Sequence, residues 1–158
     1  EPVGERRAGV QPTAYLGDTR EVRRVADVAR AEGILAKAAG RELKGPDETY
    51  ARETVLLAKY PDTVPVRIQA IRVGELGIVG IPCEVFTEIG LDIKKRSPLR
   101  RTFTVSLANG YNGYLPTAAQ HALGGYETWR ARSSYLEVGA ADAITAAALE
   151  LLGRVGRP

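Results

Sequence analysis

Tyrosine side chains gather in one glycine-rich stretch, residues 109–117, which reads NGYNGYLPT. The chain has seven tyrosines, and two of them, Tyr111 and Tyr114, lie in this stretch. A phenol oxygen can serve as a general acid or as a metal ligand. To bind a metal as phenolate its pKa must fall from about 10, which an adjacent cation can bring about. Asn-Gly pairs are typical of tight turns, which accounts for the asparagines and glycines but not for the tyrosines. The alternative is that the rings cover a sheet edge with their hydroxyls hydrogen-bonded, and for any single tyrosine the pattern favours it.

A carboxylate lies in a second stretch, residues 80–86, which reads GIPCEVF. Pro82 ends an apolar strand there, and Glu84 falls in the first turn of the helix that we expect to follow. Sites in α/β proteins commonly lie where a strand ends beside a helix start. The helix dipole also favours a negative charge in that turn. The alternative is that Glu84 only helps to cap the helix, and this stretch taken alone favours that interpretation.

A thiol offers a different chemistry. A cysteine at a helix N-terminus has a lowered pKa and can act as a nucleophile, which would apply to Cys83. His121 is the only histidine and therefore the only imidazole that could act as its base. However, Cys83 continues an apolar strand, and free cysteines are among the most buried residues, so the pattern favours a buried thiol. No second metal ligand stands near His121 at helical or strand spacing, which favours a surface loop for it.

The composition excludes several classes of protein. A single cysteine rules out an internal disulfide and a cysteine-rich metal site. The net charge of +3 is spread along the chain, whereas a nucleic-acid-binding protein would show a denser basic stripe. No apolar run approaches the roughly 18 residues of a transmembrane helix. The chain has no methionine and begins at Glu1, so we expect a processed or partial chain, with residues 1–13 as a linker or tail.

Hydrophobic periodicity predicts the elements that must position these residues. Helices are expected at 18–39, with Asp18 or Thr19 as N-cap, and at 47–58, 84–96 and 139–153. Strands are expected at 64–73, 76–81 and 102–108, the first two joined as a hairpin. This order favours an α/β fold in which helices pack on a mixed β-sheet in a single domain, with an α+β arrangement as the alternative.

The segment between the last strand and the last helix is expected to be a loop of about thirty residues. Loops longer than roughly 15 residues in compact domains are usually functional or disordered. This one carries six aromatic or imidazole side chains: Tyr111, Tyr114, His121, Tyr126, Trp129 and Tyr135. Disordered loops are poor in aromatics, so a functional loop is favoured. The residues alone therefore predict a site between Glu84 and residues 109–126, with carboxylate and phenol oxygens but no complete catalytic set.

These same residues resemble the neutral/alkaline ceramidase family, the non-lysosomal zinc amidases. The stretch VGIPCEVFTEIG resembles the family's Pro-Gly-Glu-Phe-Thr segment, in which the glutamate binds zinc, and this implies that role for Glu84. The stretch LANGYNGYLPTAAQHALGGYE resembles a block that reads Asn-x-Tyr-x-x-Tyr-x-Thr-Thr and then Tyr-Glu. It implies a zinc-binding Tyr114 and a catalytic Tyr126 beside the scissile amide. The resemblance covers residues 60–152 well and the two early helices loosely.

The resemblance implies a zinc-dependent amidohydrolase that cleaves an N-acyl amide such as ceramide into a fatty acid and a sphingoid amine. In the family, two histidines, a glutamate and a tyrosine hold the zinc, which activates a water or polarises the carbonyl. The histidines and a serine beside the oxyanion belong to the N-terminal part of the family. Residues 14–158 would then be the C-terminal part of a catalytic domain, with the upstream half of the same protein as partner. The chain alone is expected to be inactive, and the family suggests a secreted or periplasmic location.

Two positions depart from the family pattern. Cys83 stands in place of a glycine and Pro116 in place of the first threonine, so an amide other than ceramide is an alternative substrate. A non-catalytic binding or scaffold domain that keeps the fold is the alternative function. The asparagines and glycines of residues 109–113 are expected to turn the chain so that Tyr114 faces the metal beside Glu84, while Tyr111 packs against the scaffold.

Overall fold

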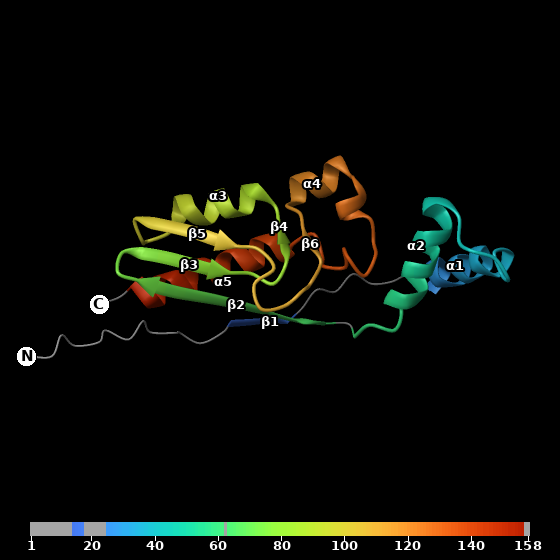
Figure 1. The fold of residues 1–158 in the computed structure, drawn as a ribbon, viewed down its shortest axis with the longest axis horizontal. Helices are drawn as coiled ribbons and strands as arrows, with labels where there is room; N and C mark the ends of the chain where they lie inside the picture. The colour runs from blue at the N-terminus through green and yellow to red at the C-terminus, as the bar shows by residue number, and fades with distance from the viewer. Residues whose placement is uncertain (1–13, 18–24, 62, 157–158) are drawn as a thin grey trace, which may run out of the picture.

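A four-stranded mixed sheet, on the left in Figure 1, carries the two helices of the hydrophobic core. The structure is a computed structural model that describes residues 14–17, 25–61 and 63–156. The strands follow the order β1 (Ala14–Gly17), β2 (Pro65–Val73), β3 (Leu76–Gly80) and β5 (Arg101–Val105). β1, β2 and β3 are antiparallel neighbours, and β5 runs parallel to β3. The predicted α/β class, with helices packed on a mixed sheet, is confirmed.

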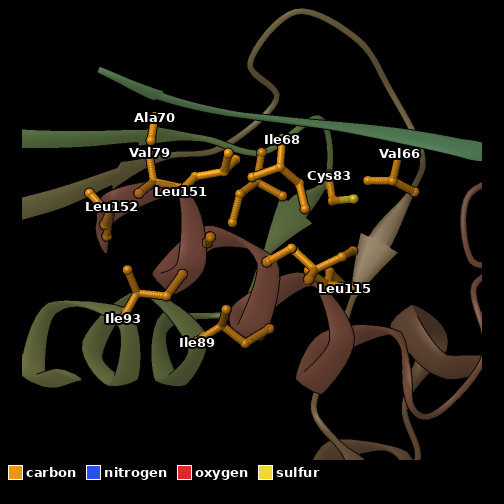
Figure 2. Close-up of a cluster of buried hydrophobic side chains, with 14 of the residues drawn as sticks. Val66, Ile68, Ala70, Val79, Cys83, Ile89, Ile93, Leu115, Leu151 and Leu152 are labelled. Atoms are coloured by element: carbon orange, nitrogen blue, oxygen red, sulfur yellow. The ribbon is translucent and has the colours of Figure 1, made fainter. Parts of the chain in front are cut away.

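Two helices cover one face of this sheet (Figure 1). α3 (Thr87–Arg96) packs on β5, and α5 (Ala140–Gly156) packs on the remaining strands and on α3. Because side chains alternate along a strand, β2 sends Val66, Ile68 and Ala70 into the layer between sheet and helices. There they meet apolar side chains of both helices, among them Ile93 and Leu152 (Figure 2). This layer is the hydrophobic core.

The opposite face of the sheet carries an apolar row. Ile71, Ile78 and Phe103 are aligned in register across β2, β3 and β5. The neighbouring side chains Val73 and Val105 are 54% and 40% exposed, and Phe103 is 45% exposed. The two helices that pack on the sheet lie on its other side. In the part of the chain that the structure describes, no helix packs on this open face, which is defined by these five residues.

A helical hairpin extends beyond one end of the sheet (Figure 1). It consists of α1 (Val25–Lys37) and α2 (Gly45–Leu57), which pack on each other. Both helices were predicted, and Gly40, with a φ of 84°, lies in the turn after α1. The N-cap candidates Asp18 and Thr19 lie outside the described residues. The same holds for the predicted linker, residues 1–13.

The helix predicted at 84–96 begins later than expected. Its first residue is Thr87, and Glu84–Val85 instead form a short strand, β4, which pairs in parallel with β6 (Tyr114–Leu115). The placement of Glu84 in the first helical turn is therefore wrong, and so is the argument from the helix dipole. Hydrogen bonds to a distant segment hold the backbone of these two residues in an extended conformation instead of a helix. One of them joins Glu84 N–H to the Gly113 carbonyl at 2.9 Å.

The strand predicted at 102–108 ends early, at Val105. The chain turns next because Leu107 and Asn109 adopt left-handed backbone angles, with φ of 55° and 59°. Leu107 N–H donates to the Cys83 carbonyl at 2.9 Å, and Ala108 N–H donates to that of Ile81 at 3.1 Å. These bonds hold the turn beside the segment that leads into β4.

The long loop predicted before the last helix is also wrong, because it contains regular structure. β6 is followed by α4 (Ala118–Leu123) and by a short 3-10 helix, η1 (Tyr126–Thr128). Thr117 and Gln120 form a capping box at the start of α4, a pattern that is readable in the sequence. β1 was not predicted at all. α5 was predicted, and it extends three residues beyond residue 153, to Gly156.

Candidate functional site

The short ladder between β4 and β6 brings Glu84 and Tyr114 together. The two residues are direct partners in this parallel pair. Adjacent strands lie about 4.8 Å apart, and directly paired residues project their side chains from the same face. The carboxylate and the phenol therefore lie side by side, and both side chains are partly buried. The predicted proximity of these two residues agrees with this pairing.

Glycine at position 113 makes this ladder possible. Gly113 has a φ of 75°, in the left-handed region that favours glycine. A Cβ at this position would lie 2.4 Å from the Ser133 carbonyl oxygen, too close for any side chain. The next residue, Tyr114, donates its N–H to the same carbonyl at 2.8 Å. The segment around Ser133 therefore fixes the position of Tyr114 from behind.

A second hydrogen bond supports the tyrosine turn. Tyr135 donates its hydroxyl to Asn112 Oδ1 at 2.9 Å, and Asn112 N–H donates to the Pro82 carbonyl at 2.7 Å. Burial raises the pKa of Tyr135 to about 12, so its hydroxyl keeps the proton that it donates. The Tyr135 ring also packs edge-on against Tyr60, with ring centroids 5.5 Å apart. Asn112 is thus held on both its backbone and its side chain.

Tyr111 does not pack against the scaffold as expected. It is 53% exposed, and its hydroxyl donates a hydrogen bond to Glu84 Oε1 at 3.3 Å. Partial burial, the charge of Glu84 and this hydrogen bond raise the pKa of Tyr111. The phenol therefore stays protonated at neutral pH and orients the Glu84 carboxylate. Sequence reasoning missed this contact because it depends on how the turn folds back over β4.

Tyr126 completes the group of phenols. Its ring meets Tyr114 edge-to-face, with centroids 5.7 Å apart and an interplanar angle of 84°. A hydrogen bond with Tyr126, burial and the Glu84 charge raise the pKa of Tyr114 to about 12. Without a cation beside it, Tyr114 keeps its proton at neutral pH, and a bound cation would favour the phenolate. Glu84, Tyr114 and Tyr126 are thus gathered at one place, and their metal and catalytic roles stay predictions.

A pocket of about 390 Å³ opens beside this group. Its lining comes from α2, from Tyr111 and from the segment before Tyr135: Thr49, Tyr50, Arg52, Glu53, Tyr111, Ala131, Arg132 and Ser133. Glu53 is only 6% exposed and accepts hydrogen bonds from both arginines. The sequence contains one hint of this ion pair: Glu53 is a charged residue on the buried face of α2, one helical turn before Leu57. Nothing in the sequence around Arg132 marks it as the partner.

Solved structures of ceramidases are similar to this chain. A neutral ceramidase from Pseudomonas aeruginosa matches with a TM-score of 0.50 and 24% identity, over 73% of this chain and 21% of that chain. A structure described as ceramidase complexed with C2 matches with a TM-score of 0.52 and 22% identity, over 77% of this chain and 22% of that chain. The fold is similar to a segment of neutral ceramidase. No family model and no curated protein matches the chain.

The similarity to neutral ceramidase confirms the predicted resemblance at the level of the fold. The chain spans about a fifth of the length of each ceramidase that it matches. The residues that carried the motif resemblance, Glu84, Tyr114 and Tyr126, are also those that the structure gathers.

The donor set fits part of a zinc shell. Zinc in proteins takes oxygen, nitrogen and sulfur ligands, usually three or four from the protein. Glu84 and Tyr114 offer two oxygens side by side. Within residues 14–17, 25–61 and 63–156, no cluster of three or more histidine, cysteine, aspartate or glutamate side chains could hold a metal. Glu84 and Tyr114 could therefore supply two ligands to a zinc ion, fewer than the three or four that zinc usually takes from a protein.

Cys83 and Pro116, the two positions that depart from the ceramidase motifs, lie behind the site. Cys83 is fully buried among Val66, Ile68 and Leu115 (Figure 2), and Pro116 is also buried. Both therefore change the packing behind β4 and β6 and do not line the exposed side of the site.

Thiol chemistry at Cys83 finds no support in its surroundings. Burial raises the pKa of this thiol to about 12, so it is not a thiolate at neutral pH. His121 lies in the last turn of α4, partly exposed, and not in the loop that we expected. Separately, none of the helices in the described residues is long and apolar enough to span a membrane.

Proposed function

We propose that this chain is one part of a zinc-dependent amidase that hydrolyses an N-acyl amide, a ceramide-like lipid. In this proposal Glu84 and Tyr114 hold the metal, and Tyr126 faces the scissile amide. The observation that carries it is the direct pairing of Glu84 with Tyr114, with the Tyr126 ring packed on Tyr114. The fold similarity to neutral ceramidase supports it independently.

Each residue of the group would have a distinct task. Zinc, when bound, supplies Lewis acidity toward a water or an amide carbonyl. Tyr111 orients the Glu84 carboxylate through its hydrogen bond, as residues behind metal ligands commonly do. Tyr126, whose ring is held by its contact with Tyr114, would donate its phenol proton to the oxyanion that develops on the amide oxygen.

The remaining parts of the site would come from an upstream half of the same protein. The motif resemblance implies that two histidines and a serine would lie there. Two observations support such a partner: the chain spans about a fifth of each ceramidase that it matches, and its open sheet face carries exposed Val73, Phe103 and Val105. Apolar patches of this kind commonly mark protein interfaces. Without that half, we expect the chain to be inactive.

The test uses the intact protein that carries this chain. Glu84→Gln and Tyr114→Phe should each lower both zinc content and N-acyl sphingosine hydrolysis, the latter by at least about 100-fold. Tyr126→Phe should keep the zinc and lower only the rate. Glu75→Gln, in the exposed turn between β2 and β3, is the matched control and should change neither. Full activity and full zinc content in the first two variants would instead support a scaffold function.

A further inference from the structure

The pocket beside the candidate site has an excess of positive charge. Two arginines, Arg52 and Arg132, face the single carboxylate of Glu53, and the other lining residues are uncharged. Arg132 donates from Nε to Glu53 Oε2 at 2.8 Å and from Nη2 to Oε1 at 3.0 Å. Arg52 donates from Nε and Nη2 to Oε1 at 3.2 and 3.1 Å. One unit of positive charge therefore stays without a counter-charge within the pocket lining.

Both guanidinium groups keep donors for a further partner. The hydrogen bonds to Glu53 use the Nε and Nη2 groups. In the part of the chain that the structure describes, the two Nη1 groups of Arg52 and Arg132 are not engaged by these bonds, and each carries two N–H donors. Both side chains line the pocket and are 48% exposed, so a ligand in the pocket can reach them. Guanidinium donors in a fixed plane bind carboxylate and phosphate groups well.

The charged pair is held rigidly. Glu53 is nearly buried and also accepts the backbone N–H of Arg132 at 3.2 Å. Hydrogen bonds from Arg132 keep the pKa of Glu53 at about 2, so its carboxylate stays ionised and keeps the arginines in place. Tyr50 forms one wall and packs edge-on against Trp129, with centroids 5.2 Å apart. A ligand would thus meet preformed donors beside an aromatic wall.

The pocket and the candidate site share a wall. Tyr111 lines the pocket and donates to Glu84. Ser133 also lines the pocket, and its carbonyl accepts the N–H of Tyr114. A molecule in the pocket would therefore contact Tyr111 and Ser133, which themselves hold Glu84 and Tyr114. Its volume of about 390 Å³ is within the range of small-molecule sites.

We infer that this pocket binds the anionic group of the substrate, so that the preferred amide is one that carries a carboxylate or a chemically similar anion. The placement of the amide at Glu84 rests on the proposed function. Binding of the anion rests only on Arg52, Arg132 and the pocket around them. The neutral head of ceramide would leave the excess positive charge without a partner.

The test is a binding titration of the chain in metal-free buffer, which separates it from any zinc-dependent activity. The probes are N-hexanoylglycine and its neutral isostere N-hexanoylglycinamide. Trp129, the only tryptophan, packs on the pocket wall and reports binding through its fluorescence. We expect the carboxylate probe to bind about tenfold more tightly than the amide probe. A hydrogen bond to a charged group contributes roughly the free energy that corresponds to a tenfold change in affinity. Equal affinity of the two probes would overturn the inference.

Three variants test whether the carboxylate of the probe binds at the arginines of the pocket. Arg52→Gln should remove the preference for the carboxylate, while Arg132 still neutralises Glu53 and keeps the fold. Arg96→Gln is the matched control, since Arg96 is exposed to a similar degree, forms one ion pair and lies outside the pocket. Ser133→Asp keeps both arginines and supplies a carboxylate in the pocket, and it should block the probe. A preference that survives in Arg52→Gln and Ser133→Asp, or is lost equally in Arg96→Gln, would contradict the proposal.

Discussion

Glu84 and Tyr114, far apart in the sequence, are directly paired in a two-residue parallel ladder. Backbone hydrogen bonds fix this relationship, among them Glu84 N–H to the Gly113 carbonyl and Tyr114 N–H to the Ser133 carbonyl. The pair is therefore in place before any ligand arrives. Its geometry depends on a few backbone positions that can be changed without touching either side chain.

Gly113→Ala should disrupt this ladder. The added Cβ would lie 2.4 Å from the Ser133 carbonyl oxygen, at a φ of 75°, so the segment must move. We expect the free energy of unfolding, measured with urea, to fall by at least about 3 kcal/mol. Gly124→Ala is the control, because Gly124 has a similar φ of 79° but open space around it. It should lose only the stability that the strained backbone angles cost, on the order of 1–3 kcal/mol and less than Gly113→Ala. Equal losses would show that the close contact is not what excludes a side chain.

Removing the Tyr111 hydroxyl should weaken zinc binding in the intact protein. Tyr111→Phe keeps the ring but loses the hydrogen bond to Glu84 Oε1, so the carboxylate is held less well. Changes of this kind behind a metal ligand typically cost about tenfold or more in metal affinity. A zinc titration against a competing chelator measures the effect. Tyr60→Phe, which alters a tyrosine packed on Tyr135, serves as the comparison and should leave the affinity unchanged.

Glu53 should make stability depend on acid pH. Its pKa is about 2 in the folded chain and about 4.5 in the unfolded one, because Arg132 and Arg52 bind the ionised form. A lowered pKa stabilises the fold above pH 4.5, and this contribution is lost as the pH falls from about 4.5 to 2. Since both arginines are half exposed, we expect a loss on the order of 2 kcal/mol, less than the full shift implies.

Urea unfolding at a series of pH values measures this contribution. Glu53→Gln should be less stable than the unchanged chain at pH 7, and the difference should shrink toward pH 2. Glu75→Gln, an exposed carboxylate in a turn, should follow the unchanged chain throughout. A stability difference that stays constant from pH 7 to pH 2 would contradict the assigned role of Glu53.

Cys83 should be unreactive in the folded chain. It is fully buried, and burial raises its pKa to about 12, so little thiolate is present at pH 8. Labelling with iodoacetamide should be slow in buffer and should reach the rate of a free thiol only in urea. Rapid labelling of the folded chain would revive the alternative of a cysteine nucleophile.

Periodicity in the sequence was enough to predict most of the fold. The alternation of Val66, Ile68 and Ala70 marked β2, and the helical spacing of Ile89 and Ile93 marked α3. Such patterns can be read from a short stretch of sequence, because burial of one face imposes a regular spacing of apolar residues within each element. The capping box of Thr117 and Gln120 is an equally local signal, and it marks the start of α4.

Nonlocal contacts could not be predicted in this way. β4 and β6 are two residues long, and backbone bonds between distant segments define them rather than any pattern of side chains. The same is true of the ion pair between Glu53 and Arg132, whose partners lie in different parts of the chain. The residues alone predicted a site between Glu84 and residues 109–126, but only the family resemblance singled out Tyr114 as the partner of Glu84. The role of Tyr111 became visible only once the turn was seen to fold over β4.

The open face of the sheet has a consequence for how the chain behaves when it is made alone. β5 is the last strand of the described sheet, so its outer backbone edge lies next to the exposed side chains of Phe103 and Val105. An unprotected strand edge beside apolar side chains promotes aggregation. The yield of the isolated chain should therefore fall with rising concentration and temperature. Co-expression with the proposed upstream half should restore the yield if that half packs on this face.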